Sequence, residues 1–369
     1  MAGRDRARDL ICLGLLALAV AAFFWPLIFT RAWIPRGGGD LVSFLWPMYR
    51  FAARSLRSGT VPLWNPHLYS GAPFVADNQS GVFYPVNLVA FAAFGPPSYA
   101  VMEGLVAFYL WLAAAATFAL LRGLGLRRVA ALTGALAFAL SDLFVTHLGN
   151  LNLNATVAWL PLLLWLMHEA LTRESVGWAA VAGAVLAAAA LAGHAQMLLF
   201  VGLALALYVI YRLAALLARG GDGVGRRVTR VMGLSALIVA VGVGGAALTL
   251  LPAYRMAGHT GRGHLPYEEA TRYSLPPRAL VGLVAPGFYG RGPAGFWGPW
   301  DRVEVGYAGV GTLLLAALGL VTYGSRRASS DSPSPTPTPD CRTAGLRSPA
   351  SFPVVFFALL VLIAFPLAL

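Results

Sequence analysis

Long apolar runs separated by short polar stretches dominate the pattern of the chain. A helix needs about 20 mainly apolar residues to cross the hydrocarbon core of a bilayer, and runs of about this length recur through the sequence. They predict spans at residues 10–30, 99–121, 129–147, 153–171, 177–194, 197–217, 231–252, 305–323 and 352–369. The pattern therefore predicts an all-α fold, a polytopic transmembrane helical bundle of about nine spans.

Two long mixed segments, residues 31–98 and 253–304, interrupt this series of spans. The run Val82–Phe94 in the first segment is apolar but too short to span comfortably. We therefore expect the first segment to contain a re-entrant or interfacial element.

Composition supports a membrane protein. Hydrophobic residues make up 58% of the 369 residues and charged residues 11%, whereas soluble domains carry roughly 25% charged residues. These values exclude a soluble globular enzyme, a disordered chain and a disulfide scaffold. The formal net charge is +12, and all 27 basic residues are arginine. The arginines lie between the apolar spans, which indicates topology control and contact with the lipid bilayer, with no nucleic-acid partner.

The arginines also predict the orientation of the bundle, because cytoplasmic loops carry an excess of basic residues. A cytoplasmic N-terminus places the short basic loops inside, with Arg122, Arg127, Arg128, Arg173, Arg219, Arg226, Arg227, Arg230, Arg326 and Arg327. The short loops near Gly149 and Gly193 then lie outside and carry no arginine. Both long segments face the exterior in this arrangement.

The predicted organisation has three parts. Residues 1–327 form the transmembrane core with outer loops 31–98 and 253–304, and residues 328–350 form a cytoplasmic linker rich in Ser, Thr and Pro. Residues 351–369 begin a further transmembrane helix, so the chain looks like part of a longer protein.

Asp40 is the first candidate for chemistry. It follows Gly37-Gly38-Gly39, about ten residues after the first predicted span. A carboxylate held there at the membrane surface would act as a general base toward a hydroxyl group. The alternative is an N-cap for the helix that follows, since Asp is a favoured capping residue.

The stretch Leu41–Gly59 has the periodicity of an amphipathic helix lying in the membrane interface. Pro47 should bend this helix or limit its start. One side of it carries Arg50, Arg54 and Arg57. These arginines would hold the phosphate of a lipid-linked donor, or they extend toward the headgroups of the outer leaflet.

Other polar residues of the outer side are candidates for substrate binding, each with a structural alternative. Asp77 and Gln79 would bind hydroxyl groups or cap a turn. The remaining candidates lie in short outer turns or in the second long segment, namely His147, His194, Gln196 and Glu268. A polar contact at the helix turn is the alternative for His194 and Gln196. No His/Asp/Glu spacing specifies a metal site or another cofactor, and a divalent metal ion remains an open alternative.

Asp142 lies inside a predicted span, toward its outer end. Intramembrane acids usually face the bundle or a cavity. A functional role and a structural hydrogen bond to a neighbouring helix are both open for this residue.

Several stretches resemble the bacterial YfhO family of membrane proteins. They are PLWNPHLYSGAPFVADNQSGVFYPVN at 62–87, HLGNLNLNATVAWLPLLL at 147–164, GHAQ at 193–196 and YSLPP at 273–277, together with Asp40 after the first span. The family is similar to glycosyltransferases of the GT-C type, which take a sugar from a polyprenyl phosphate on the outer face and place a catalytic acid in the first outer loop. Asp40 matches that position. Members are usually considerably longer, and the Ser/Thr/Pro linker looks like a local insertion.

The resemblance implies a glycosyltransferase of the bacterial plasma membrane that adds sugars to a cell-envelope polymer. A transporter or flippase of a lipid-linked substrate is the first alternative, and Asp142 favours it. A non-catalytic membrane scaffold is the second, because most candidate residues have structural explanations.

Overall fold

The computed structural model describes residues 2–34, 39–260, 266–271, 274–290, 297, 306–330 and 356–361. About 74% of the described residues are helical and strand is almost absent among them, which confirms the all-α prediction. The α-helices are α1 (Ala2–Phe23), α2 (Trp25–Phe29), α3 (Trp46–Arg57), α4 (Pro85–Phe94), α5 (Tyr99–Gly123), α6 (Arg128–Ala139), α7 (Asp142–Thr146), α8 (Leu151–Val157), α9 (Leu160–Thr172), α10 (Val176–Leu191), α11 (Ala195–Arg219), α12 (Val224–Ala257), α13 (Tyr267–Ala270) and α14 (Val310–Ser330).

Shorter elements complete the described chain. Leu41–Leu45 forms a π-helical turn, and Asn78–Ser80 and Pro277–Leu283 form 3₁₀ helices. The two short strands β1 (Trp64–Asn65) and β2 (Ala72–Pro73) pair antiparallel, with Trp64 opposite Pro73.

Five helical segments of the described chain are long and apolar enough to cross a membrane. They are Tyr99–Gly123, Arg128–Thr146, Leu151–Thr172, Ala195–Arg219 and Val224–Ala257. α10 has 16 residues, and the apolar part of α14 runs over Val310–Thr322. α1 carries Asp5, Asp9 and three arginines in its first turns. The chain therefore has the helices of a membrane protein, and the number of nine spans stays a prediction.

Several predicted boundaries differ from the structure. Three predicted spans are each broken into two helices, at Phe24, at Leu140–Ser141 and at Ala158–Trp159. α12 continues to Ala257, so the prediction of a loop from residue 253 is wrong at its start. Pro252 removes only one backbone N–H from the hydrogen bonds of the helix, and the helix continues beyond the missing bond.

The C-terminal predictions are tested only in part. α14 continues to Ser330, so the first three residues of the predicted linker are helical. Residues 331–350 lie outside the described residues, and of the predicted last span only residues 356–361 are described, as helix.

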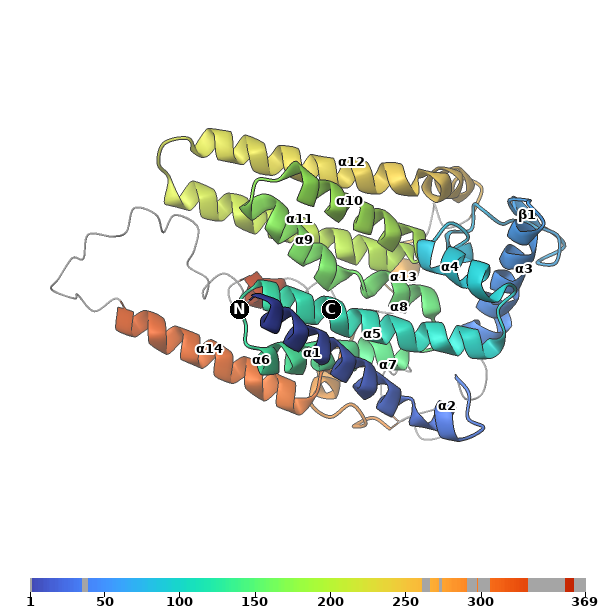
Figure 1. The fold of residues 1–369 in the computed structure, drawn as a ribbon, viewed down its shortest axis with the longest axis horizontal. Coiled ribbons are helices and arrows are strands. Elements are labelled where there is room, and N and C mark those ends of the chain that lie inside the picture. Colours follow the sequence, from blue (N-terminus) through green and yellow to red (C-terminus); the bar gives the residue numbers. More distant parts are fainter. Residues whose placement is uncertain are drawn as a thin grey trace.

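α10 and α12 pack against each other through small residues. A Cβ atom at Gly183 would lie 2.5 Å from the Cβ of Val241, and one at Gly242 would lie 2.7 Å from Cδ2 of Leu186. Glycines at such points let two helix backbones approach closely, which is a common way to join helices in a membrane. Figure 1 shows α12 running beside α10 along one side of the bundle.

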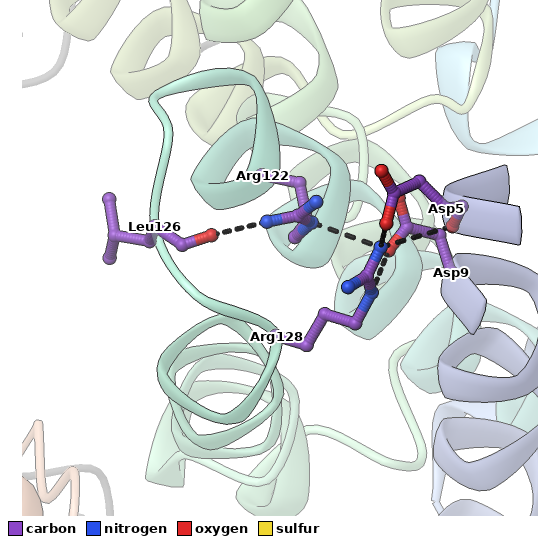
Figure 2. A network of polar contacts seen from close by, with 5 residues as sticks. All are labelled: Asp5, Asp9, Arg122, Leu126 and Arg128. Atoms are coloured by element: carbon purple, nitrogen blue, oxygen red, sulfur yellow. Dashed lines mark hydrogen bonds and ion pairs between the residues drawn. The ribbon is translucent and has the colours of Figure 1, made fainter. Parts of the chain in front are cut away.

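We call the end of the bundle that holds the N-terminus the inner end, following the predicted orientation (Figure 1). There Arg128 binds both Asp9, with 2.6 Å between Nε and Oδ1, and Asp5, with 2.9 Å between Nη2 and Oδ1 (Figure 2). Arg122 lies 3.4 Å from the same Asp9 oxygen and donates to the Leu126 carbonyl at 2.6 Å. These contacts join α1 to the loop between α5 and α6, two regions that the arginine pattern places on the same side.

The opposite, outer end gathers the short elements α2, α3, α4 and β1 (Figure 1). α4 has ten residues, which makes it about 15 Å long. It is therefore too short to cross a hydrocarbon core of about 30 Å. The candidate residues of the long outer segment 31–98 all lie at this end.

Candidate functional site at the outer end

Asp40 is exposed, and its side chain makes no capping hydrogen bond. Its backbone is already helical, with φ −57° and ψ −32°, whereas a capping residue has a non-helical backbone that turns its side chain toward the first N–H groups. The Gly39 carbonyl instead accepts from the N–H of Ser43 at 3.0 Å and from its hydroxyl at 2.8 Å. The capping interpretation of Asp40 is therefore wrong, and its carboxylate faces solvent.

The helix after Asp40 has the predicted apolar side. Leu41, Leu45, Met48 and Ala52 are buried. Pro47 lies in the first turn of α3, where its missing N–H leaves no helical bond unmade. A π-helical turn precedes it, with the Trp46 N–H bonded to the Leu41 carbonyl. Pro47 thus limits the start of the regular helix, as its position in the sequence predicts.

The three arginines of this helix have different surroundings. Arg50 lies over the Trp46 ring at 5.4 Å and donates to the Pro97 carbonyl at 3.4 Å. Nη1 of Arg57 lies 2.7 Å from the place that a Cβ atom of Gly95 would take. Arg50 and Arg57 thus contact the turn between α4 and α5, and both Arg54 and Arg57 are exposed. These two exposed guanidinium groups are accessible to a phosphate ligand.

Buried polar contacts connect α3, the first outer segment and α8. The Tyr49 hydroxyl donates to Oδ1 of Asn152 at 2.9 Å, and Nδ2 of Asn152 donates to the Gln79 carbonyl at 2.7 Å. Nδ2 of Asn87 donates to the carbonyl of Gly81, a residue with φ +53°, at 2.9 Å. We call Tyr49, Gln79, Asn87 and Asn152 the outer junction.

Gly193 adds the turn before α11 to the outer junction. It has φ +92°, and a Cβ atom there would lie 2.2 Å from the Asn78 carbonyl oxygen and 3.2 Å from Nδ2 of Asn152. The outer junction therefore brings together three of the stretches that carry the family resemblance, at 62–87, 147–164 and 193–196.

Asp77 and Gln79 lie in one turn. Oδ1 of Asp77 accepts from the Gln79 N–H at 2.9 Å and starts the 3₁₀ helix that follows. Of the two interpretations of Asp77, the turn cap is the contact that the structure contains. The Gln79 side chain is exposed while its backbone bonds to Asn152.

The predicted histidines both lie at helix ends of the outer side. Nδ1 of His147 lies 2.8 Å from the Leu143 carbonyl oxygen, and His194 caps α11 by accepting the Met197 N–H on Nδ1 at 3.3 Å. Burial, followed by the charge of His147, lowers the pKa of His194. The two histidines are therefore electrostatic neighbours, and Gln196 beside them is exposed.

We expect His194 to make the stability of the protein depend on pH. Its pKa is lower in the folded chain than in the unfolded chain, so the unfolded state binds the proton first as the pH falls. Its contribution is fully present above about pH 6.5, the ordinary histidine value, and is lost below it. The variant His194→Asn keeps a capping side chain and should flatten the decrease in melting temperature between about pH 7 and pH 5. A pH slope for His194→Asn equal to that of the wild type would contradict the assignment.

Side chains of α5 form hydrogen bonds to the start of the first outer segment, and this contact was not predicted from the sequence. Oε1 of Glu103 accepts the Ile34 N–H at 2.9 Å, and the Tyr99 hydroxyl donates to the Ile34 carbonyl. Nε1 of Trp46 donates to the Pro97 carbonyl at 2.9 Å. The only signal in the sequence was an acid near the start of an otherwise apolar span.

One predicted residue, Glu268, lies in the second outer segment, and Asp142 contacts the chain just after that segment. Glu268 lies in the four-residue helix α13 and is exposed. Among the described residues, no hydrogen bond or ion pair joins it to Asp40. Oδ2 of Asp142 accepts the Gly306 N–H at 3.1 Å, and its own N–H donates to the Tyr307 carbonyl at 2.9 Å. Asp142 therefore makes structural hydrogen bonds to the chain that follows this segment.

In the described part of the chain, no group of three or more His, Cys, Asp or Glu side chains is arranged to hold a metal ion. No family model, curated protein or solved structure matches this chain. The YfhO-like and GT-C-like assignments therefore stay predictions from the sequence.

Proposed function

We propose that the protein is a membrane glycosyltransferase that works on the exterior face, with Asp40 as its general base. The observation that carries this proposal is the exposed Asp40 carboxylate, which makes no cap at the start of an interfacial helix. A base must be within reach of the hydroxyl it deprotonates, and an exposed carboxylate at the end of the bundle satisfies that need.

The proposed reaction is a single displacement. Asp40 takes the proton of an acceptor hydroxyl, the hydroxyl oxygen bonds to the anomeric carbon of the sugar, and the bond from that carbon to the lipid phosphate breaks with its electron pair on the phosphate. The charge of the leaving phosphate would be stabilised by guanidinium groups, and Arg54 and Arg57 are the exposed arginines of α3 available for this role.

The substrates and location follow from the resemblance of the sequence. The donor would be a polyprenyl-phosphate-linked sugar, and the acceptor a polymer of the cell envelope. The reaction would take place at the bacterial plasma membrane. The packing of the resembling stretches at the outer junction supports a shared role for them.

The test is an Asp40→Asn variant of the complete reading frame, expressed in a strain that lacks the native gene. Losing a general base costs about 10²- to 10⁴-fold in rate, so we expect the sugar to disappear from the mass spectra of the envelope glycans. Asp222→Asn is the matched control, since Asp222 is exposed between α11 and α12 and should leave the glycans unchanged. Membrane abundance is compared by immunoblotting.

An unchanged glycan profile in Asp40→Asn would reject the proposal, provided that deleting the gene does remove the sugar. If the purified protein moved a lipid-linked substrate across the liposome membrane and formed no covalent product, the result would instead support a transporter or flippase. Asp142, which favoured that alternative, binds the backbone of Gly306 and Tyr307. Tolerance of alanine at Asp40, Asp77 and Glu268 together would support a scaffold.

A further inference from the structure

A groove of about 490 Å³ lies at the inner end, between the start of α10 and the first turns of α12. It is formed by Val176 of α10 and by Arg226, Thr229, Arg230, Gly233, Leu234 and Leu237 of α12. The groove is far from the outer junction along the bundle, and the proposed transferase reaction does not use it.

The residues of α12 are ordered along the groove by polarity. Arg226, Arg230 and Leu234 follow each other at intervals of four, so they lie on one face of the helix. Thr229, Gly233 and Leu237 form a parallel row beside them. The groove is therefore basic along the first two turns of α12 and apolar along the turns that follow. The distance along the helix from Arg226 to Leu237 is about 16 Å.

The length of α12 places this change of polarity at the membrane surface. Its 34 residues extend about 51 Å, whereas the hydrocarbon core is about 30 Å thick. With the helix centred in the bilayer, its first seven residues lie at the depth of the headgroups. Arg226 and Arg230 are then level with lipid phosphates, and Leu234 and Leu237 are level with acyl chains.

Arg230 is held in place by the turn between α9 and α10. Its Nη2 donates to the Glu174 carbonyl at 2.9 Å, and its Nε lies 4.0 Å from the Glu174 carboxylate. Glu174 has φ +50°, an unusual conformation for a residue with a side chain. The groove thus has two exposed guanidinium groups, those of Arg226 and Arg230, and the Glu174 carboxylate lies beside that of Arg230.

We propose that this groove binds an anionic phospholipid of the inner leaflet. Its phosphate contacts the guanidinium groups of Arg226 and Arg230, and an acyl chain lies over Gly233 and Leu237. Basic pockets between membrane helices on the cytoplasmic side bind anionic lipid headgroups. A free phosphate ion would use only the basic half, so the apolar half assigns the groove to a lipid.

The test measures lipid binding to the purified full chain by native mass spectrometry in detergent. Phosphatidylglycerol and phosphatidylcholine with the same acyl chains are titrated, and we expect the anionic lipid to bind tighter. Each arginine near an anionic lipid surface contributes about fivefold in affinity. Arg226→Gln should therefore weaken binding of phosphatidylglycerol about fivefold, and the double variant Arg226→Gln/Arg230→Gln about 25-fold.

Two matched controls separate the site from general charge and from folding. Arg227 is exposed on the same turn but does not line the groove, so Arg227→Gln should change the affinity less than twofold. Glu174→Gln removes the carboxylate from the edge and should tighten binding, an effect that misfolding would not produce.

The apolar half has its own test. A Cβ atom meets nothing within 4 Å at either Gly233 or Gly244. Gly233→Leu would fill the groove and weaken lipid binding, whereas Gly244→Leu further along α12 should not. Equal affinity for the two lipids, equal effects of Arg226→Gln and Arg227→Gln, or displacement of the lipid by millimolar inorganic phosphate would each overturn the proposal.

Discussion

Replacing Gly193 by alanine should lower the free energy of unfolding by about 4 kcal/mol, near the upper end for single substitutions. The φ of +92° alone makes a side chain unfavourable at this position by roughly 1–2 kcal/mol. The new Cβ atom would also lie 2.2 Å from the Asn78 carbonyl oxygen. Because that oxygen belongs to backbone, the clash is relieved only by moving the first outer segment away from the turn before α11.

The measurement is chemical unfolding of the purified protein in detergent micelles. Gly202→Ala is the control, since a Cβ atom there meets nothing within 4 Å and the residue lies within helix α11. Alanine is the better helix former by up to about 1 kcal/mol, so this control should be neutral or slightly stabilising. A Gly193→Ala protein as stable as wild type would contradict the close approach of the two segments.

Replacing Asn152 by alanine should cost about 3 kcal/mol of stability in the same assay. Asn152 is buried, and it is the partner of both the Tyr49 hydroxyl and the Gln79 carbonyl. Each buried polar group left without its partner costs roughly 1–3 kcal/mol. Both lost hydrogen bonds are made by α8, one to α3 and one to the first outer segment. The contacts of the outer junction should therefore weaken together.

A double-mutant cycle with Tyr49→Phe checks the cause of this loss. Tyr49→Phe removes the hydroxyl and keeps the ring, so the single variant should be destabilised by about 1 kcal/mol. Once Asn152 is alanine, the hydroxyl has lost its acceptor, and removing it should cost less than in the wild type. Strictly additive effects of the two substitutions would show that the hydrogen bond contributes nothing.

The apolar runs predicted the long helices well because burial in lipid requires a continuous helix. The span predicted at 99–121 is α5, Tyr99–Gly123, and the span predicted at 197–217 is α11, Ala195–Arg219. The apolar runs did not reveal where a helix is interrupted. Hydropathy does not distinguish one helix from two short ones in line, so the breaks at Leu140–Ser141 and Ala158–Trp159 were missed.

The local chemistry of the candidate site was predicted less well. Asp40 has the residue type of a cap, but whether it caps depends on its backbone angles, which composition does not specify. Asp77 does cap its turn, with the same residue type. The long-range pairing of Tyr49 with Asn152, across 103 positions in the sequence, has no local pattern that would reveal it.

The seven residues of α8 are all buried, and they include Asn152, Asn154 and Thr156. The segment Leu151–Thr172 that begins with this helix is the least apolar of the five that are long enough to span. Asparagines left without partners in lipid are costly, so this segment is poorly suited to leave the translocon alone. We expect this segment to stay beside α5 during synthesis until the neighbouring helices cover it. The amide side chains of Asn152 and Asn154 would then influence the order in which the helices insert as well as their final packing.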